Sequence, residues 1–330
     1  MRVTHWKLLA ILALAILAGL PIATYVVTTS RRMVKTEYQF EIRSPILIGE
    51  DSDFTRVGAG SGCECVRTGS GTESDPYLIS RWTINASATD GIIVFGTSSH
   101  FIVRDVEIRG NGLSEGIHLD RVDNGKIVDC LIVGNSIGVY SFRSRNLQFI
   151  NNTIEENTYG IKLEVSDGSR VLSNRFNQIK QVAIFVRGPN NSVTENVVRG
   201  AFGGINIDGT AGGANDNMVV QNSISDTMVY GIGVWRAART VVRNNMITQN
   251  KGVGIVLTER SSNNSVEANV VTENRGGGIL ISEGSSQNTI KDNTAKGNGD
   301  GVRSFDLADT SSGNTWKNNT YDTKTPDTLE

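Results

Sequence analysis

Short segments in which apolar and polar residues alternate recur along this chain from about residue 76 onward, at intervals of 21 to 27 residues. Each repeat carries a Gly, once replaced by Ala, followed by an apolar residue, any residue and a second apolar residue. Such alternation has the period of a β-strand with one buried face. The ten copies begin at Gly91, Gly116, Gly138, Gly160, Ala183, Gly204, Gly231, Gly254, Gly278 and Gly301.

A second repeated mark is an Asn followed two residues later by an apolar residue. It occurs at Asn152, Asn174, Asn196, Asn222, Asn245, Asn269, Asn293 and Asn319, and Cys130 takes the first such position. An apolar residue stands three positions before each of them. Asn tolerates the left-handed backbone of a tight corner, and stacked Asn side chains can hydrogen-bond to one another. We therefore predict that these Asn form a column at one corner and that the repeated Gly serves a neighbouring corner at positive φ.

The fold follows from the shortness of the repeat. No repeat can bury its apolar face alone, so neighbouring repeats must stack to form a core. Parallel strands normally need a crossover of a dozen residues or more, and a coil of about 23 residues leaves no room for a helix. The chain must therefore wind as a solenoid, right-handed and rising about 4.8 Å per coil. The sequence predicts an all-β fold, a right-handed parallel β-helix of about ten coils over residues 76–322.

The N-terminal segment has a different pattern, because residues 8–27 are nearly all apolar. About 20 apolar residues suffice for a helix that spans a bilayer. We expect residues 1–36 to be an uncleaved signal-anchor rather than a cleaved secretory signal, since the Pro21-Ile22-Ala23 stretch fits a cleavage site poorly. The β-helix is then expected outside the cytoplasm, on a single-pass protein of the cell membrane, or secreted if the signal is cleaved.

Two flanking segments complete the expected organisation. Residues 37–75 are expected to form an N-terminal cap and linker, because an open sheet edge invites aggregation. Residues 323–330 are expected to form a polar tail.

Composition excludes some functions and leaves others open. A net charge of -2 without a basic stripe gives no reason to expect nucleic acid as a partner. Three cysteines exclude a disulfide-dense scaffold. Cys63 and Cys65 fit a loop pair or a strained disulfide better than a soft-metal site, and Cys130 fits a buried thiol. Five N-x-Ser/Thr glycosylation motifs begin at Asn85, Asn151, Asn190, Asn263 and Asn318. A repeat this rich in Asn produces such motifs even where no glycan is attached.

The repeats resemble the parallel β-helix repeat family, which includes pectate lyases, polygalacturonases and NosD-like proteins. The start of the region is more specific. Phe54-Thr55 and the segments 69–79, 82–85 and 97–104 resemble the opening of archaeal-type exported NosD-like proteins. The resemblance covers residues 46–322. It implies the β-helix fold and leaves the activity open, because such folds host lyases, hydrolases, binders and surface-layer components.

If the Gly-anchored strands stack, the outward residues form two columns. The first is Ile93, His118, Tyr140, Lys162, Phe185, Asn206, Gly233, Val256, Leu280 and Arg303. The second is Phe95, Asp120, Phe142, Glu164, Arg187, Asp208, Trp235, Thr258, Ser282 and Phe305. Aromatic faces pack on sugar rings, and carboxylates and Arg can bind hydroxyl or acidic groups. We therefore expect the face from His118 to Trp235 to bind a polysaccharide or cell-envelope polymer.

Three acids on this face are candidate catalytic residues, namely Asp120, Glu164 and Asp208. They are expected two coils apart, or about 9.6 Å, close to the roughly 6.5–9.5 Å between the carboxyls of inverting glycosidases. Arg187 lies one coil from both Glu164 and Asp208, so a ladder of ion pairs explains these acids more simply. A lyase would need an Arg beside clustered Ca²⁺-binding carboxylates, and these acids are dispersed.

Three functions therefore remain: a membrane-tethered polymer binder, which we favour, a polysaccharide-cleaving hydrolase or lyase, and a NosD-like accessory protein for a copper enzyme. The ligand inventory disfavours the third function. Only His100 and His118 follow the apolar segment, without a Met-rich or His-rich cluster. No metal or cofactor is expected; Ca²⁺ and copper lack support.

Overall fold

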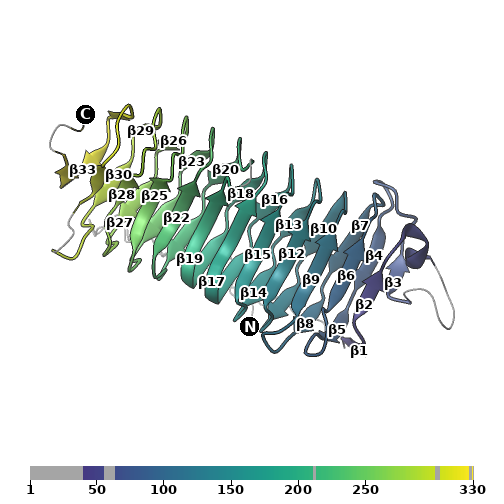
Figure 1. Ribbon diagram of the computed structural model, residues 1–330. Helices are drawn as coiled ribbons and strands as arrows, with labels where there is room; N and C mark the ends of the chain where they lie inside the picture. The colour runs from purple at the N-terminus through teal and green to yellow at the C-terminus, as the bar shows by residue number, and fades with distance from the viewer. Residues whose placement is uncertain (1–39, 56–63, 211–212, 302–304, 327–328, 330) are drawn as a thin grey trace, which may run out of the picture. The chain divides into compact units, whose positions relative to one another are not determined.

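The structure is a computed structural model that describes residues 40–55, 64–210, 213–301, 305–326 and 329. Within these residues the chain winds through about ten stacked coils, each made of short strands (Figure 1). Among the described strands, all pairings are parallel except that between β3 (Val66–Thr68) and β4 (Tyr77–Ser80). The predicted all-β solenoid is thus confirmed, and a single-turn 3-10 helix, η1 (Asp51–Phe54), lies between its second and third strands.

Each coil contributes a strand to three faces. The first face is the 12-stranded sheet of β3 (Val66–Thr68), β4 (Tyr77–Ser80), β7 (Phe101–Arg104), β10 (Gly125–Val128), β13 (Gln148–Ile150), β16 (Arg170–Leu172), β18 (Ser192–Thr194), β20 (Met218–Val220), β23 (Val241–Arg243), β26 (Ser265–Glu267), β29 (Thr289–Lys291) and β32 (Thr315–Lys317).

The second and third faces belong to one 22-stranded sheet, because β17 (Arg175–Arg187) and β19 (Val197–Asp208) run through both. The second face consists of the N-terminal parts of β17 and β19 together with β1 (Glu41–Arg43), β5 (Trp82–Asn85), β8 (Glu107–Arg109), β11 (Leu131–Val133), β14 (Thr153–Glu155), β21 (Ser223–Ser225), β24 (Met246–Thr248), β27 (Val270–Thr272), β30 (Thr294–Lys296) and β33 (Thr320–Tyr321). The third face consists of the C-terminal parts of β17 and β19 together with β2 (Ile46–Ile48), β6 (Ile92–Phe95), β9 (Glu115–Asp120), β12 (Ile137–Phe142), β15 (Tyr159–Glu164), β22 (Tyr230–Trp235), β25 (Val253–Thr258), β28 (Ile279–Ile281), β31 (Leu307–Asp309) and β34 (Lys324–Thr325).

The predicted apolar column lines the core. These residues stand three positions before each corner Asn, and they are fully buried except Trp316, which is 8% exposed. They are Ile127, Phe149, Val171, Val193, Val219, Val242, Val266, Ile290 and Trp316. Stacking of such short apolar strands therefore supplies the continuous core that no single coil could form.

The corner Asn column forms the predicted amide ladder. Each side-chain nitrogen donates to the side-chain oxygen of the Asn one coil further on, over 2.9–3.0 Å from Asn152 to Asn319. The prediction that these Asn adopt the left-handed backbone is wrong, because the positive φ lies one residue earlier. The residue before each of them has φ between 53° and 58°, and these residues are Asn151, Ser173, Glu195, Gln221, Asn244, Ala268, Asp292 and Asn318.

The repeated Gly has a different role from the predicted one. The Gly from Gly91 to Gly278 in this column are absent from the positive-φ glycines of the described residues. They are required because a Cβ would collide with the next coil. At Gly116 it would lie 2.5 Å from the carbonyl oxygen of Gly138, and at Gly204 it would lie 2.2 Å from that of Gly231. Close approach of backbones therefore selects Gly here.

The prediction that a tenth copy of the repeat begins at Gly301 is wrong. The strand that pairs with β28 is β31, so Ala308, and not Arg303, lies beside Leu280. Residues 302–304, including Arg303, lie outside the described residues. Asp306 ends a second row of stacked side chains, formed by Asn250, Asn274 and Asn298, and accepts a hydrogen bond from the side chain of Asn298 over 2.8 Å.

The ends of the solenoid extend slightly beyond the expected limits. Within residues 37–75, β1 and β2 pair in parallel with β5 and β6 and so begin the 22-stranded sheet ahead of residue 76. At the other end, β34 within the expected tail pairs with β31. Residues 1–36 and the apolar run 8–27 lie outside the described residues. Among the described residues, no helix has the length and apolar character needed to cross a membrane.

The described cysteines differ in state. Cys65 is disulfide-bonded, so its sulfur is not a free thiolate ligand, and Cys63 lies outside the described residues. Cys130 is a free buried thiol, as predicted, and burial raises its pKa to about 12.

Candidate functional site

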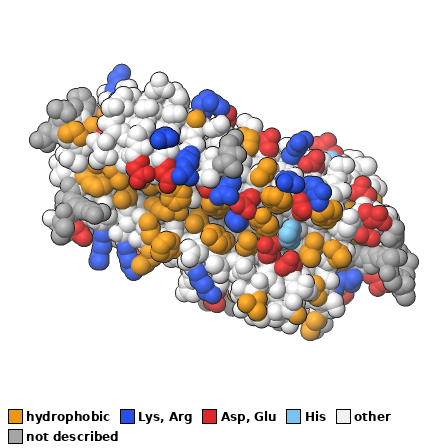
Figure 2. All heavy atoms as spheres, viewed as in Figure 1, with side chains coloured by type: hydrophobic (Ala, Val, Ile, Leu, Met, Phe, Trp, Pro, Cys, Tyr) orange, Lys and Arg blue, Asp and Glu red, His pale blue; other side chains and the backbone are white. Residues whose placement is uncertain are grey.

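The two predicted outward columns lie on the third face. His118 pairs with Tyr140 and Tyr140 with Lys162, and the register continues through Phe185, Asn206 and Gly233. The neighbouring column runs through Asp120, Phe142, Glu164 and Arg187, continues to Asp208 through its ion pair with Arg187, and reaches Trp235. Figure 2 shows charged and hydrophobic side chains interleaved along this surface. All eleven predicted ligand-binding residues therefore occur in adjacent coils of one sheet.

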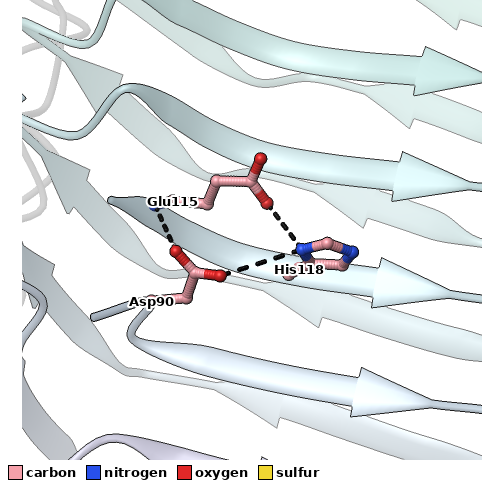
Figure 3. Close-up of side chains that lie close together, drawn as sticks. All are labelled: Asp90, Glu115 and His118. Carbon is pink, nitrogen blue, oxygen red and sulfur yellow. Dashed lines mark hydrogen bonds and ion pairs between the residues drawn. The ribbon is translucent and has the colours of Figure 1, made fainter. Parts of the chain in front are cut away.

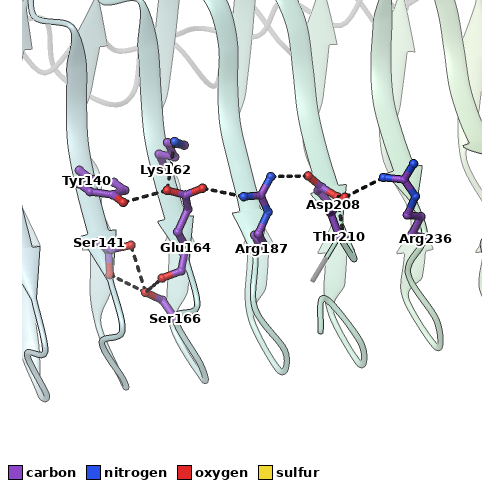
Figure 4. Close-up of polar contacts among 9 residues, drawn as sticks. All are labelled: Tyr140, Ser141, Lys162, Glu164, Ser166, Arg187, Asp208, Thr210 and Arg236. Atoms are coloured by element: carbon purple, nitrogen blue, oxygen red, sulfur yellow. Dashed lines mark hydrogen bonds and ion pairs between the residues drawn. The ribbon is translucent and has the colours of Figure 1, made fainter. Parts of the chain in front are cut away.

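Two of the three predicted catalytic acids take part in a row of ion pairs (Figure 4). Arg187 donates to Glu164 over 2.9 Å and to Asp208 over 2.8 Å. Lys162 approaches Glu164 to 3.1 Å, and the Tyr140 hydroxyl donates to it over 2.8 Å. The ladder interpretation is thus confirmed for this pair of acids. We call Tyr140, Lys162, Glu164, Arg187 and Asp208 the ion-pair row.

The row continues beyond Asp208. Thr210 donates its hydroxyl to Asp208, Arg236 donates to Thr210 over 3.0 Å, and Arg236 pairs with Glu259 at 2.6 Å. A cavity of about 300 Å³ adjoins the row at this corner. Its lining residues include Arg187 of the row, with Val165, Gly188, Pro189, Thr210, Gly213, Asn215 and Asp216.

The environment keeps both acids of the row ionised. Burial alone would raise the pKa of Glu164, but hydrogen bonds from Tyr140 and Lys162 and the nearby cations lower it below its ordinary value. Burial alone would also raise the pKa of Asp208. Hydrogen bonds from Thr210 and Arg187 outweigh this effect, so the pKa of Asp208 is lowered as well. A glycosidase general acid needs a raised pKa. Glu164 and Asp208 therefore lack the property that an acid–base pair of this kind requires.

The lowered pKa of Glu164 gives a stability prediction. A carboxyl whose pKa is lower in the folded chain contributes stability above its ordinary value of 4.5, and loses it as the pH falls through the folded value. Replacing Glu164→Gln should therefore reduce the free energy of unfolding by about 1–3 kcal/mol at pH 7. The difference should shrink below pH about 4. Urea denaturation at several pH values measures it.

Glu155→Gln is the control, because Glu155 lies on the second face in β14 without an ion pair among the described residues. It should leave stability unchanged across the same pH range. A Glu164→Gln effect that persisted undiminished in acid would contradict the ionic origin of the stabilisation.

Asp120 stands apart from the row. Its carboxylate lies 3.4 Å from the guanidinium of Arg121, and Phe142 separates it from Glu164 in the column. Arg121 in turn lies 4.1 Å from the ring centre of Phe95. The structure therefore does not join the three candidate acids into one group.

Aromatic rings alternate with these polar groups. Tyr140 stacks beside Phe142 with ring centres 6.2 Å apart, and Phe185 has Arg187 5.1 Å from its ring centre. Tyr230 and Trp235 meet edge to face at 4.9 Å. Between these groups Asn206 is 2% exposed, and its side-chain oxygen has no hydrogen-bond partner.

A third outward column escaped the sequence prediction. It holds the residue that directly precedes each repeated Gly, as the pairings of Ile137 with Glu115 and with Tyr159 show. Its members from Asp90 onward are Asp90, Glu115, Ile137, Tyr159, Val182, Gly203, Tyr230 and Val253. The signal was present in the sequence, because two acids and two tyrosines precede the Gly in these copies.

This column completes a cluster around His118 (Figure 3). Nδ1 of His118 lies 2.8 Å from Glu115 and 3.8 Å from Asp90, and the Glu115 amide donates to Asp90 over 2.7 Å. The hydrogen bond to Glu115 raises the pKa of His118, burial opposes this, and the charges of Glu115, Asp90 and Asp120 add to the rise. The Tyr140 ring meets the imidazole edge to face at 5.2 Å.

Known structures share this architecture. The A-module of the mannuronan C-5 epimerase AlgE4 of Azotobacter vinelandii is 12% identical, with a TM-score of 0.63 over 76% of this chain and 83% of that one. A double mutant of the periplasmic alginate epimerase AlgG is 17% identical, with a TM-score of 0.61 over 74% and 68%. The catalytic unit of a GH87 α-1,3-glucanase from Streptomyces thermodiastaticus is 14% identical, with a TM-score of 0.52 over 77% and 63%. At these identities the likeness shows the fold alone.

No curated protein matches the sequence. The finer resemblance to archaeal-type exported NosD-like proteins therefore stays an expectation. The family model described as the right-handed β-helix region matches residues 51–198 and again residues 174–321. Together these matches cover most of the chain, which therefore belongs to the right-handed β-helix family.

Proposed function

We propose that this protein binds a polysaccharide along the third face, between the coils of His118 and Trp235. The observation that carries the proposal is the register itself, which places aromatic rings and paired polar groups in unbroken columns across successive coils. A linear polymer lying along these columns would meet a different pair of side chains at each strand spacing of about 4.8 Å. Tethering by residues 8–27 and a place outside the cytoplasm stay predictions.

The charges of the ion-pair row favour recognition of hydroxyl groups. Two carboxylates, Glu164 and Asp208, are balanced by the two cations Lys162 and Arg187. The row therefore presents fixed hydrogen-bonding groups with little net charge. Aromatic side chains such as Phe142 and Trp235 add surfaces on which the apolar faces of sugar rings can pack.

The similar structures support a carbohydrate partner. By their names, two of them are epimerases of mannuronan or alginate and one is an α-1,3-glucanase. The two alternatives have less support. Cleavage by Glu164 and Asp208 would need a protonated acid, whereas both have a lowered pKa. A copper-enzyme accessory role lacks a His-rich or Met-rich cluster among the residues that the structure describes.

Size exclusion of the full chain with neutral and acidic polysaccharides tests the proposal. We expect the protein to elute with at least one polymer whose length is unchanged. Trp235→Ala should weaken that binding by about tenfold or more, because loss of a stacking aromatic residue removes much of the contact energy. Dissociation constants measured by affinity electrophoresis give the comparison.

The matched control is Phe40→Ala, since Phe40 is an exposed aromatic residue ahead of β1 and away from the row. It should bind the polymer as the unmodified chain does. Shortened polymer would instead establish an enzyme, and loss of that cleavage in Glu164→Gln would assign the acid. Absence of any interaction would reject polysaccharide binding.

A further inference from the structure

The cluster of Asp90, Glu115 and His118 has the spacing of a metal-binding group. One imidazole nitrogen and one oxygen from each carboxylate all lie within 4.8 Å of one another. The donors come from two adjacent coils, and Figure 3 shows all three side chains converging. All three are half-buried on the third face, where a bound ion would remain accessible from solvent.

The electrostatics of the cluster are incomplete without a further cation. Among the residues that the structure describes, the ion pairs of Asp90 and Glu115 are with His118 alone. A single imidazole faces two carboxylates, so a divalent ion would relieve the repulsion between Asp90 and Glu115. This differs from the ion-pair row, where acids and cations are equal in number.

The donors are already held in place. The backbone N–H of Glu115 holds one oxygen of Asp90 and leaves the other directed at the imidazole. The ring of Tyr140 packs against His118 edge to face and restricts its rotation. Tyr140 is itself fixed by its hydrogen bond to Glu164. Such support of the ligands by surrounding groups is typical of metal sites.

We propose that Asp90, Glu115 and His118 bind a divalent transition-metal ion, with Zn²⁺ as the best representative. Ca²⁺ and Mg²⁺ prefer sites made of oxygen donors alone, whereas one imidazole with carboxylates suits Zn²⁺ and its neighbours. The ion would replace the proton between Nδ1 of His118 and Glu115. This proposal departs from the expectation, drawn from sequence, that no metal would be bound.

Three protein ligands leave at least one coordination position open. The three ligands lie on the face proposed to bind polysaccharide, and His118 is one coil from Tyr140. A bound ion could therefore coordinate a hydroxyl or carboxylate oxygen of a sugar. The metal site does not depend on the proposed function, because it can be tested with the metal alone.

Equilibrium dialysis of the full chain against Zn²⁺, followed by elemental analysis, tests the site. We expect one Zn²⁺ per chain, with affinity reduced about tenfold or more in His118→Ala and in Glu115→Gln. His100→Ala is the matched control, since His100 precedes β7 on the first face, and it should bind Zn²⁺ normally. Circular dichroism confirms that each variant is folded, and Glu115→Gln preserves the side-chain shape.

A full chain that retains no Zn²⁺, or a folded His118→Ala variant that binds it undiminished, would overturn the proposal. Co²⁺ provides a second readout, because its visible absorption reports imidazole and carboxylate coordination and should be lost in His118→Ala. Polysaccharide binding measured on Zn²⁺-free protein separates the two proposals. If the polymer still binds while Zn²⁺ does not, only the metal site is wrong.

Discussion

Replacing Asn196→Ala is expected to destabilise the solenoid by about 3–5 kcal/mol, among the largest effects of any single substitution in this chain. Asn196 is fully buried, and its amide nitrogen donates to the carbonyls of Val171 and Thr194 and to Asn222. Its oxygen accepts from both the backbone and the side chain of Asn174. Alanine would leave these buried groups without partners, and each unsatisfied group costs about 1–3 kcal/mol.

Urea denaturation of the purified full chain measures this effect. Asn177→Ala is the control, because Asn177 lies exposed in the same region of β17 and outside the ladder. It should change stability by less than about 0.5 kcal/mol. Equal stability of the two variants would show that the ladder contributes little beyond the packing of the coils.

The second large effect is expected from Gly204→Ala. A Cβ at Gly204 would lie 2.2 Å from the carbonyl oxygen of Gly231 and 2.9 Å from the Ile224 side chain. Because the first neighbour is backbone within a parallel pairing, adjacent coils would have to separate. We expect a loss of about 3 kcal/mol or more, or failure to fold. Soluble yield and thermal unfolding by circular dichroism measure the outcome.

Gly213→Ala supplies the comparison, since a Cβ there has no heavy atom within 4 Å and Gly213 is not at positive φ. That variant should fold with unchanged stability. If Gly204→Ala were equally well tolerated, close approach of the coils would not be the reason for Gly in this column.

The sequence predicted the solenoid because the fold depends on features repeated in every coil. The apolar positions that stand three residues before each corner Asn all face the core, and the Asn side chains stack as expected. The reasons given for individual residues were less accurate. A pattern of residue types does not reveal which of two neighbours adopts positive φ. Consequently Asn151, and not Asn152, has the left-handed backbone.

The same limit applies at the C-terminal end. Gly301 begins a segment that matches the repeat by letter, yet the strand beside β28 starts at Leu307. Pairing is decided by which residues reach the core, and Leu307 is fully buried. A local motif does not reveal which of two neighbouring segments, here those that begin at Gly301 and at Leu307, will pair with β28.

The candidate site was predictable only where alternation continues unchanged. His118 and Asp120 were placed correctly because they lie on the outward side of a regular strand. Asp90 and Glu115 were missed because simple alternation does not place Glu115, three residues from His118, on the same side of the strand. Contacts between coils, such as those of Arg187 with two acids, required the register as well as the columns.

The coil-by-coil register has a consequence for how such a protein can diverge. Each coil pairs only with its two neighbours, so inserting one whole coil between β15 and β17 would preserve the backbone pairings and the amide ladder. It would nevertheless move Glu164 one further strand spacing, about 4.8 Å, from Arg187 and so break their ion pair. Duplication or deletion of single coils can therefore rewrite the surface chemistry in discrete steps while leaving the core unaltered.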